Sequence, residues 1–450
     1  MRRILTLFSF LVLAVTASAA PPNIVMIISD DQSWTDYGFM GHDAIQTPHL
    51  DKLAEQSYTF SRGYVPTALC RPSLATMISG LYTHQHQISG NDPSLLLAKR
   101  DSPEYEALRE QLIANLDGPP KVPQILGKLG YLSHQSGKWW EGSWERGGFT
   151  HGMTRGFPER GGRHGDDGLK IGREGLEPVT GFIDEAVAAK KPFFVWYAPF
   201  LPHTPHNPPA RLLEKYSVGD RTKSVAKYYA MCDWFDETCG QLLGHLDEAG
   251  VAENTLVVYV TDNGWIQKPD ANGYAPRSKQ SPNEGGTRTP IMFRWPGVIA
   301  PKMDTTNLCS SIDLVPTMLA AAGAEVPDGL PGLDLNAVLK GEAKLERDTI
   351  FGEGCAHDVR QIEEPEASLL YRWVIEDKWK LLLTYDGEVG RYKSSHPRTE
   401  MRPQLFDLIA DPNEDSNLAK DNPEVVARLA KKIADWYPVK ERKVIETWTE

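Results

Sequence analysis

The sequence lacks an excess of positive charge, internal repeats and low-complexity segments. Its 450 residues carry 60 acidic and 48 basic side chains, which gives a formal net charge of −12. This balance argues against nucleic acid or an anionic membrane surface as the main partner. The length and the absence of repeats favour a globular chain with one large core and a smaller appended unit.

Apart from its first residues, the sequence also lacks an apolar run of the roughly 20 residues that span a bilayer. The N-terminal run has the form of an export signal: Arg2 and Arg3 precede apolar residues 4–15 and small residues 17–20. It is too short for an anchor, and no cysteine near the cleavage site can carry a lipid. We expect residues 1–20 to be a signal peptide, the mature protein to be secreted or periplasmic, and no membrane span to remain.

Cysteine is scarce, and its count of five is odd. Export leads to an oxidising compartment where paired cysteines are permitted, so at least one cysteine needs another explanation. Cys232 and Cys239 share a segment that we predict to be helical. Seven residues of helix rise about 10 Å, which is too far for a disulfide, so we expect both in the core.

Short apolar runs alternate with helix-like patterns, which is typical of an α/β fold with a largely parallel sheet. Strands are expected at 23–29, 130–136, 192–198 and 255–261. Helices are expected from 47, over 122–129 and over 225–249. After about residue 341, strand-like runs at 371–375 and 379–384 and a helix near 423–436 predict a smaller α+β subdomain. We therefore divide the mature chain into a catalytic domain, 21–340, and a C-terminal subdomain, 341–450.

Each of the four expected strands leads into polar residues. In strand order these are Asp30 and Asp31, then Lys138, then His203 and His206, then Asp262 and Asn263. Ligands of open α/β sheets bind beyond the carboxyl ends of the strands. Four endings with complementary chemistry therefore predict one assembled site.

A metal site is the first hypothesis for these strand ends. Asp30, Asp31, Asp262 and Asn263 offer oxygen ligands, which suit Ca²⁺ or Mg²⁺, whereas zinc favours histidine or cysteine. Two adjacent acids also repel each other and need a cation or a basic partner. Taken singly, these residues are equally explained as a helix cap and a turn. Taken together, they favour the metal.

Cys70 opens the segment CRPSLATMISG, residues 70–80. Alone, it is either a buried thiol before a helix or a reactive thiolate at a helix N-terminus. The segment resembles the signature of the type I sulfatases of the alkaline phosphatase superfamily, which read Cys, any residue, Pro, Ser and close with Ser-Gly or Thr-Gly. Further matching segments follow in order at 23–31, 47–51, 137–139, 202–203, 261–264, 279 and 284–288.

The resemblance implies a sheet sandwiched by helices, as in alkaline phosphatase, and a Cys70 that a maturation enzyme oxidises to formylglycine. The hydrated formylglycine would join the four oxygen donors around the metal. One hydroxyl would attack sulfur, and the second would expel sulfate as the aldehyde re-forms. Lys138 and Lys279 match lysines that bind the sulfate and stabilise developing charge. His203 matches the histidine that protonates the leaving alkoxide.

Two positions depart from the family pattern. Leu74 stands where the signature usually has arginine, which bears on the maturation of Cys70. Trp140 replaces a histidine that contacts the formylglycine. Substitute histidines are His84, His86, His151 and His164, of which we prefer His164.

The glycine- and charge-rich loop 151–173 is expected to border the site. Its arginines suit a second sulfate or a carboxylate, which they would bind bidentately. Tryptophans near the strand ends favour a sugar, because their faces stack on C–H groups, although most tryptophans serve packing. The candidate substrate-binding residues are Trp140, His164, Arg173 and His206.

We therefore predict hydrolysis of an organic sulfate ester, favouring a sulfated carbohydrate, with Ca²⁺ preferred over Mg²⁺. One alternative keeps the fold and changes the chemistry to a phosphodiesterase or phosphonate monoester hydrolase, because fold alone does not fix the reaction. The other is an inert sulfoglycan-binding protein, which would follow if Cys70 stays a thiol.

Overall fold

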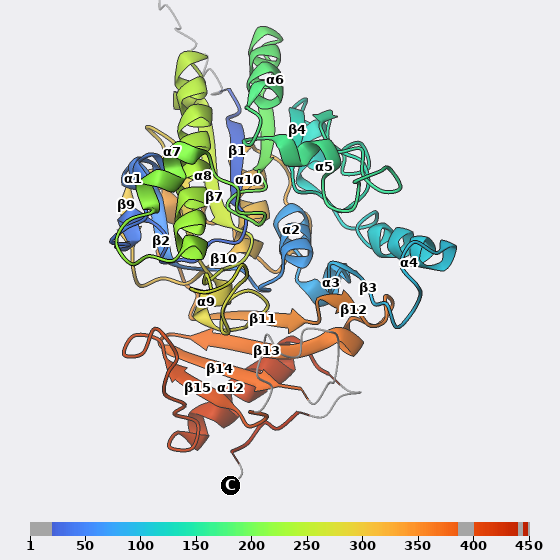
Figure 1. The fold of residues 1–450 in the computed structure, drawn as a ribbon, viewed down its shortest axis with the longest axis vertical. Helices are drawn as coiled ribbons and strands as arrows, with labels where there is room; N and C mark the ends of the chain where they lie inside the picture. The colour runs from blue at the N-terminus through green and yellow to red at the C-terminus, as the bar shows by residue number, and fades with distance from the viewer. Residues whose placement is uncertain (1–19, 386–399, 440–443, 449–450) are drawn as a thin grey trace, which may run out of the picture.

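The computed structural model describes residues 20–385, 400–439 and 444–448, and residues 1–19 of the expected signal peptide lie outside these ranges. The chain forms a large α/β unit and, beside it, a smaller unit built on a second sheet (Figure 1). Within the described ranges, no helix combines the length and apolarity needed to cross a bilayer.

The first sheet is mostly parallel. Its strands lie in the order β10 (Cys309–Ser310), β2 (Tyr58–Tyr64), β8 (Arg288–Arg294), β7 (Thr255–Thr261), β1 (Asn23–Ser29), β6 (Phe193–Ala198), β4 (Leu132–Gly137) and β5 (His151–Gly152), and β9 (Lys302–Asp304) pairs with β2. Only β8 runs antiparallel to its neighbours among these described strands. The predicted fold class is confirmed, and the four predicted strands are β1, β4, β6 and β7.

Helices cover both faces of this sheet. Along β1, Ile24, Met26 and Ile28 face one core, and Val25 and Ile27 face the other, because side chains of a strand alternate between its faces. The first face is covered by α2 (Cys70–Ser79), α4 (Pro103–Ala114), α5 (Val122–Gly127), α10 (Leu314–Ala321) and α11 (Asn336–Leu339). The second is covered by α1 (Pro48–Glu55), α6 (Glu177–Ala188) and α8 (Lys223–Glu248). Short helices α3 (Thr83–His86), α7 (Ala210–Tyr216) and α9 (Glu284–Thr287) lie in the connections.

The smaller unit is an antiparallel sheet in the order β11 (Thr349–Cys355), β13 (Leu369–Glu376), β14 (Trp379–Thr384) and β15 (Gln404–Asp407). Helix α12 (Pro423–Trp436) packs on one face through Leu429 and Ile433. The opposite face packs against the larger unit, where Trp373 and Ile375 of the smaller sheet share one hydrophobic cluster with Tyr64 and Leu308. A short parallel pair, β3 (Asp92–Pro93) with β12 (Asp358–Val359), is a second connection between the units.

All five cysteines are buried. Cys232 and Cys239 lie in α8 and pack in separate clusters, so the prediction that they are core residues is confirmed.

Candidate active site

The polar strand ends meet because β7, β1, β6 and β4 are neighbours in the sheet. Ser29 and Thr261 are paired in register, so the residues after them emerge side by side. Asp31 follows with a left-handed φ of 65°, which aspartate tolerates better than most residues. On β4, Gly137 has a φ of 85°, and a Cβ there would lie 1.8 Å from the carbonyl oxygen of Ala198. A glycine is therefore required for the turn that delivers Lys138.

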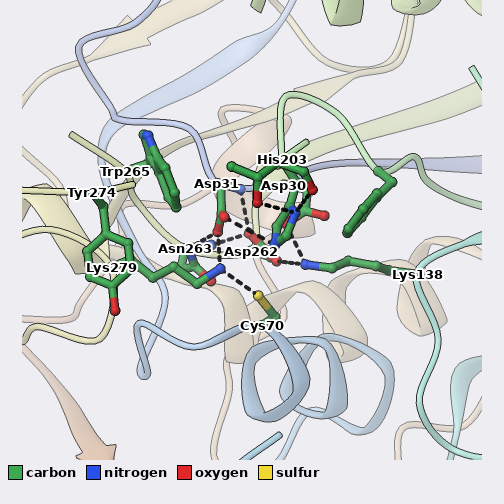
Figure 2. A network of polar contacts seen from close by, with 12 residues as sticks. Asp30, Asp31, Cys70, Lys138, His203, Asp262, Asn263, Trp265, Tyr274 and Lys279 are labelled. Carbon is green, nitrogen blue, oxygen red and sulfur yellow. Dashed lines mark hydrogen bonds and ion pairs between the residues drawn. The ribbon is translucent and has the colours of Figure 1, made fainter. Parts of the chain in front are cut away.

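The four predicted oxygen donors are all buried at one point (Figure 2). Asp30 Oδ2, Asp31 Oδ2 and Asn263 Oδ1 have no hydrogen-bond donor among the described residues. Asp262 is held by backbone N–H groups, since its Oδ1 accepts from Asp31 at 3.1 Å and from Asn263 at 2.6 Å. Buried oxygens normally have partners. Orphaned carboxylate and amide oxygens at one point fit a hard cation.

Cys70 belongs to the same cluster. Its Sγ and ligand atoms of Asp30, Asp31 and His203 all lie within 4.8 Å of one another. Burial raises the pKa of Cys70 to about 12, although Lys138 and Lys279 act to lower it. The thiol is therefore neutral at physiological pH, which does not support a reactive thiolate at this helix N-terminus.

Two buried lysines flank the acids. Lys138 Nζ lies 2.5 Å from Asp30 Oδ1, and Lys279 Nζ lies 2.5 Å from Asp31 Oδ1. Burial raises the pKa of Asp30 well above its usual value, because Lys138 offsets only part of that effect and the neighbouring acids add to it. Burial acts in the same sense on Asp31, but Lys279 and His203 outweigh it, and the pKa of Asp31 is lowered. The two adjacent aspartates thus differ in pKa: the charged form is disfavoured at Asp30 and favoured at Asp31.

His203 lies in the loop after β6. Its Nδ1 lies 2.5 Å from the carbonyl oxygen of Thr204, and its Nε2 lies 3.4 Å from Asp31 Oδ2. The ring stacks on Phe200 at 4.2 Å between centroids. Burial lowers the pKa of His203 well below its usual value, and Asp31 only partly compensates. The contact with Thr204 assigns the proton to Nδ1 and leaves Nε2 facing the cluster.

Arg173 has surroundings different from those expected of a substrate ligand. Its guanidinium donates to the carbonyl oxygens of Phe200, at 2.9 and 2.6 Å, and of His203, at 2.9 Å. It also donates to Asn207 Oδ1 at 2.5 Å. These donors are committed to the loop that carries His203, so Arg173 holds that loop in place.

Comparisons with known proteins decide the family. A family model described as Sulfatase matches residues 22–324, and one described as N-sulphoglucosamine sulphohydrolase, C-terminal, matches residues 278–437. The chain belongs to the sulfatase family. It is a sulfuric ester hydrolase, as the resemblance of the Cys70 segment implied.

Relatives of known activity span most of this sulfatase. Human arylsulfatase A is 28% identical over 472 residues, covering 92% of this chain and 87% of the relative. N-acetylgalactosamine-6-sulfatase of Canis lupus familiaris is 27% identical, covering 78% and 72%. Among solved structures, the PsFucS1 sulfatase from Pseudoalteromonas sp. aligns with a TM-score of 0.68 at 20% identity, covering 94% and 92%. BT4656, solved with its substrate D-glucosamine-2-N,6-O-disulfate, aligns with a TM-score of 0.67 at 19% identity, covering 92% and 97%.

The sulfatase has a cleft with two lobes around this cluster. The basic lobe, of about 530 Å³, is lined by Cys70, Asn91, Leu95, Arg100, Lys138, Trp140, Arg163 and His164. The aromatic lobe, of about 830 Å³, is lined by Trp265, Tyr274, His206, Asp31, Lys227 and residues of two loops, 204–207 and 272–280. His203, Lys279 and His357 line both lobes and therefore lie where the lobes meet.

The structure separates the four substitute histidines. His164 lines the basic lobe, with its ring 5.4 Å from that of Trp140. His84 pairs with Glu353, His86 contacts Thr76 and His151 pairs with Glu185, and none of these three lines either lobe.

His357 was missed by sequence reasoning. It lies in the turn between β11 and β12, in the C-terminal subdomain, and its Nδ1 lies 2.6 Å from Asp358 Oδ1. Asn91 Oδ1 accepts the backbone N–H of Arg71, so Asn91 Nδ2 faces His357 Nε2 at 3.3 Å. This network assigns the proton of His357 to Nδ1. Its one signal in the sequence was the adjacent pair His357-Asp358 after a strand. The pair is far along the chain from the other site residues, so the sequence did not connect it with them.

The C-terminal subdomain also holds the loop that carries Lys279. Glu414 Oε2 accepts the backbone N–H of Glu284 at 2.8 Å, and the Glu414 carbonyl accepts from Arg277 at 2.9 Å. Buried Lys380 lies 2.9 Å from Glu284 Oε1 and 3.2 Å from Glu414 Oε1. Both ends of the Lys279 segment are therefore fastened to the smaller unit.

Proposed function

We propose that this sulfatase is an exported enzyme that hydrolyses sulfate esters of a carbohydrate, with a formylglycine made from Cys70 and a bound Ca²⁺. The observation that carries the proposal is the convergence of Cys70, two lysines and the orphaned oxygens at one point. Lys279 Nζ lies 3.0 Å from Cys70 Sγ, and the same ammonium contacts Asp31. Export rests on the N-terminal sequence alone.

The residues that would hold the cation are Asp30, Asp31, Asp262, Asn263 and the side chain at position 70. Oxygen ligands of this kind suit Ca²⁺, and Mg²⁺ is less favoured because it keeps several waters and demands a stricter geometry. A bound cation would neutralise the acids and polarise the sulfate oxygens. The formylglycine would supply the attacking hydroxyl.

The remaining chemistry belongs to the side chains. Lys138 and Lys279, held by Asp30 and Asp31, would donate hydrogen bonds to the sulfate oxygens and stabilise the charge that develops there. His203 would donate a proton to the ester oxygen from Nε2 in its doubly protonated form, because its Nδ1–H is held by the Thr204 carbonyl, and the negative charge of a bound sulfate would favour that form. Arg173 would keep that histidine in position through the loop carbonyls.

A carbohydrate substrate is supported by the lining of the cleft. Trp265 and Tyr274 line the aromatic lobe with aromatic rings, and His206 adds a polar side chain. Relatives named for N-acetylgalactosamine 6-sulfate and a structural neighbour bound to a disulfated glucosamine act on sulfated amino sugars. We propose this substrate class for the present sulfatase.

The departure at Leu74 agrees with the packing of the folded helix. Leu74 is buried and packs in the first core with Met77 and Ile78, so an apolar residue fits this position of the folded helix. Maturation of Cys70 therefore has to be tested directly.

The decisive experiment combines two measurements on protein from its native host. The first is the mass of the peptide that contains Cys70, where formylglycine is expected. The second is the release of sulfate from 4-nitrophenyl sulfate and from monosulfated N-acetylhexosamines, before and after treatment with a chelator. An unmodified thiol in active protein would refute the formylglycine, and full activity after removal of calcium would refute the cation.

A further inference from the structure

The outer wall of the basic lobe carries more positive charge than its own carboxylates neutralise. Asp92 is buried there, and it receives Arg163 Nε at 3.0 and 2.9 Å on its two oxygens. Arg109 Nη1 approaches the same carboxylate at 3.6 Å. Two guanidiniums therefore share this carboxylate, and a second carboxylate, Asp358, lies beside Asp92 as its register partner and pairs with His357.

Arg100 adds a further positive charge to this wall. It is exposed, it lines the basic lobe, and it forms no ion pair within the described ranges. No aspartate or glutamate is among the described residues that line this lobe. The inner lysines differ, because Lys138 and Lys279 each already contact an aspartate.

Arg163 is presented to the lobe in a fixed orientation. Its Nε and Nη2 are bound to Asp92, and its Nη1 has no acceptor among the described residues. The Arg163 side chain is 35% exposed, whereas that of Asp92 is 2% exposed. The buried carboxylate therefore holds the arginine in place while part of the guanidinium remains accessible from the lobe. A fixed guanidinium loses little freedom when it binds a planar or tetrahedral anion.

We propose that Arg100 and Arg163 bind a second anionic group, a carboxylate or a sulfate, on the saccharide whose sulfate is hydrolysed at Cys70. This inference rests on the proposed function and narrows its substrate class to sugars or oligosaccharides with at least two negative charges. Guanidiniums bind both carboxylates and sulfates through paired N–H donors, so these two arginines could bind either group. In this proposal Lys138 and Lys279 bind the sulfate that is hydrolysed. Arg100 and Arg163 bind the second anionic group, which remains on the sugar.

Binding to the Cys70→Ser protein tests this proposal without turnover. Calorimetry would compare N-acetylgalactosamine 6-sulfate, its 4,6-disulfate, and a disaccharide that joins a uronate to the 6-sulfate. We expect one or both dianionic ligands to bind about tenfold more tightly than the monosulfate, as charge-assisted hydrogen bonds would give. Preference for the disulfate identifies a second sulfate, and preference for the disaccharide identifies a carboxylate.

Arg100→Gln and Arg163→Gln should each reduce this preference in the same Cys70→Ser protein and leave the affinity for the monosulfate within about twofold. Arg100 is exposed, so its variant tests the proposal even if loss of Arg163 disturbs Asp92. The matched control is Arg155→Gln, an exposed arginine that pairs with Asp167 and does not line the lobe. An equal effect of Arg155→Gln would show general charge steering and overturn the proposal.

Equal affinity for all three ligands, or no binding of either dianion, would also overturn the proposal. Failure of the proposed function is recognised separately, because wild-type protein would then not release sulfate from 4-nitrophenyl sulfate, which has a single charge and does not need the outer wall.

Discussion

Lys279 Nζ lies 3.0 Å from Cys70 Sγ, and its charge is held there by Asp31 at 2.5 Å. The lysine comes from the loop between β7 and α9, and the cysteine from the first turn of α2. Two segments that are 209 residues apart in sequence are therefore joined by one buried ammonium. A group in this position contacts both the side chain at position 70 and any anion that approaches it.

Replacing this ammonium should impair chemistry more than folding. We expect Lys279→Met to lower kcat/KM for aryl sulfates about 10²- to 10³-fold, because it removes one preorganised donor to the sulfate. Steady-state kinetics would measure the loss, with exposed Lys268→Met as the matched control. A loss below about threefold would remove Lys279 from the sulfate site.

A bound cation should stabilise the fold. Calcium at a hundredfold excess over its Kd should add about 2.7 kcal/mol to the free energy of unfolding, because it binds only the folded site. Thermal unfolding with calcium, with magnesium and with chelator would measure the effect. Asp30→Asn should abolish the calcium shift, and exposed Asp43→Asn should retain it. An unchanged shift in Asp30→Asn would show that the cation binds elsewhere.

The residues at the strand ends could be predicted because the signal for each of them lies in a short stretch of sequence. Each donor directly follows a strand, and parallel strands bring their carboxyl ends together, so Asp30, Asp31, Asp262 and Lys138 could be assigned to one site. His357 could not, because it depends on how a second sheet packs against the first. The hydrogen bonds from Arg173 to the loop carbonyls could not be predicted either, since a sequence does not show which carbonyl groups lie near a loop arginine.

Arg173 should act through the position of His203. We expect Arg173→Ala to lower kcat about tenfold to a hundredfold for alkyl sulfates, because the loop carbonyls lose their donor and the histidine shifts. Aryl sulfates need less help from a proton donor, so their kcat should fall less. Exposed Arg211→Ala is the control. A rise in KM at constant kcat would indicate direct substrate binding.

Asp92 should make stability depend on pH. Burial alone would raise its pKa, but Arg163 and Arg109 outweigh this and lower the pKa from 3.8 to about 2. The unfolded state then binds more protons between these values, so the stabilisation is complete above about pH 4 and is lost as pH falls toward 2. At pH 7, Asp92→Asn should cost at least about 2 kcal/mol.

Urea unfolding at pH 7 and near pH 2 would check this prediction, with exposed Asp220→Asn as the control. The difference between wild-type protein and Asp92→Asn should shrink at the lower pH. A difference that is the same at both values would mean that the ionised carboxylate is not what stabilises this part of the structure.

The smaller unit contributes to the cleft through His357 and fastens both ends of the Lys279 segment through Glu414. On the ribosome, all of these residues emerge after the strand ends that carry Asp30, Lys138 and Asp262. We therefore expect the nascent enzyme to be inactive while only its large unit has formed. A premature stop codon between residues 285 and 414 would release a protein that retains the proposed metal ligands and Lys279 but lacks the Glu414 contacts that hold the Lys279 segment.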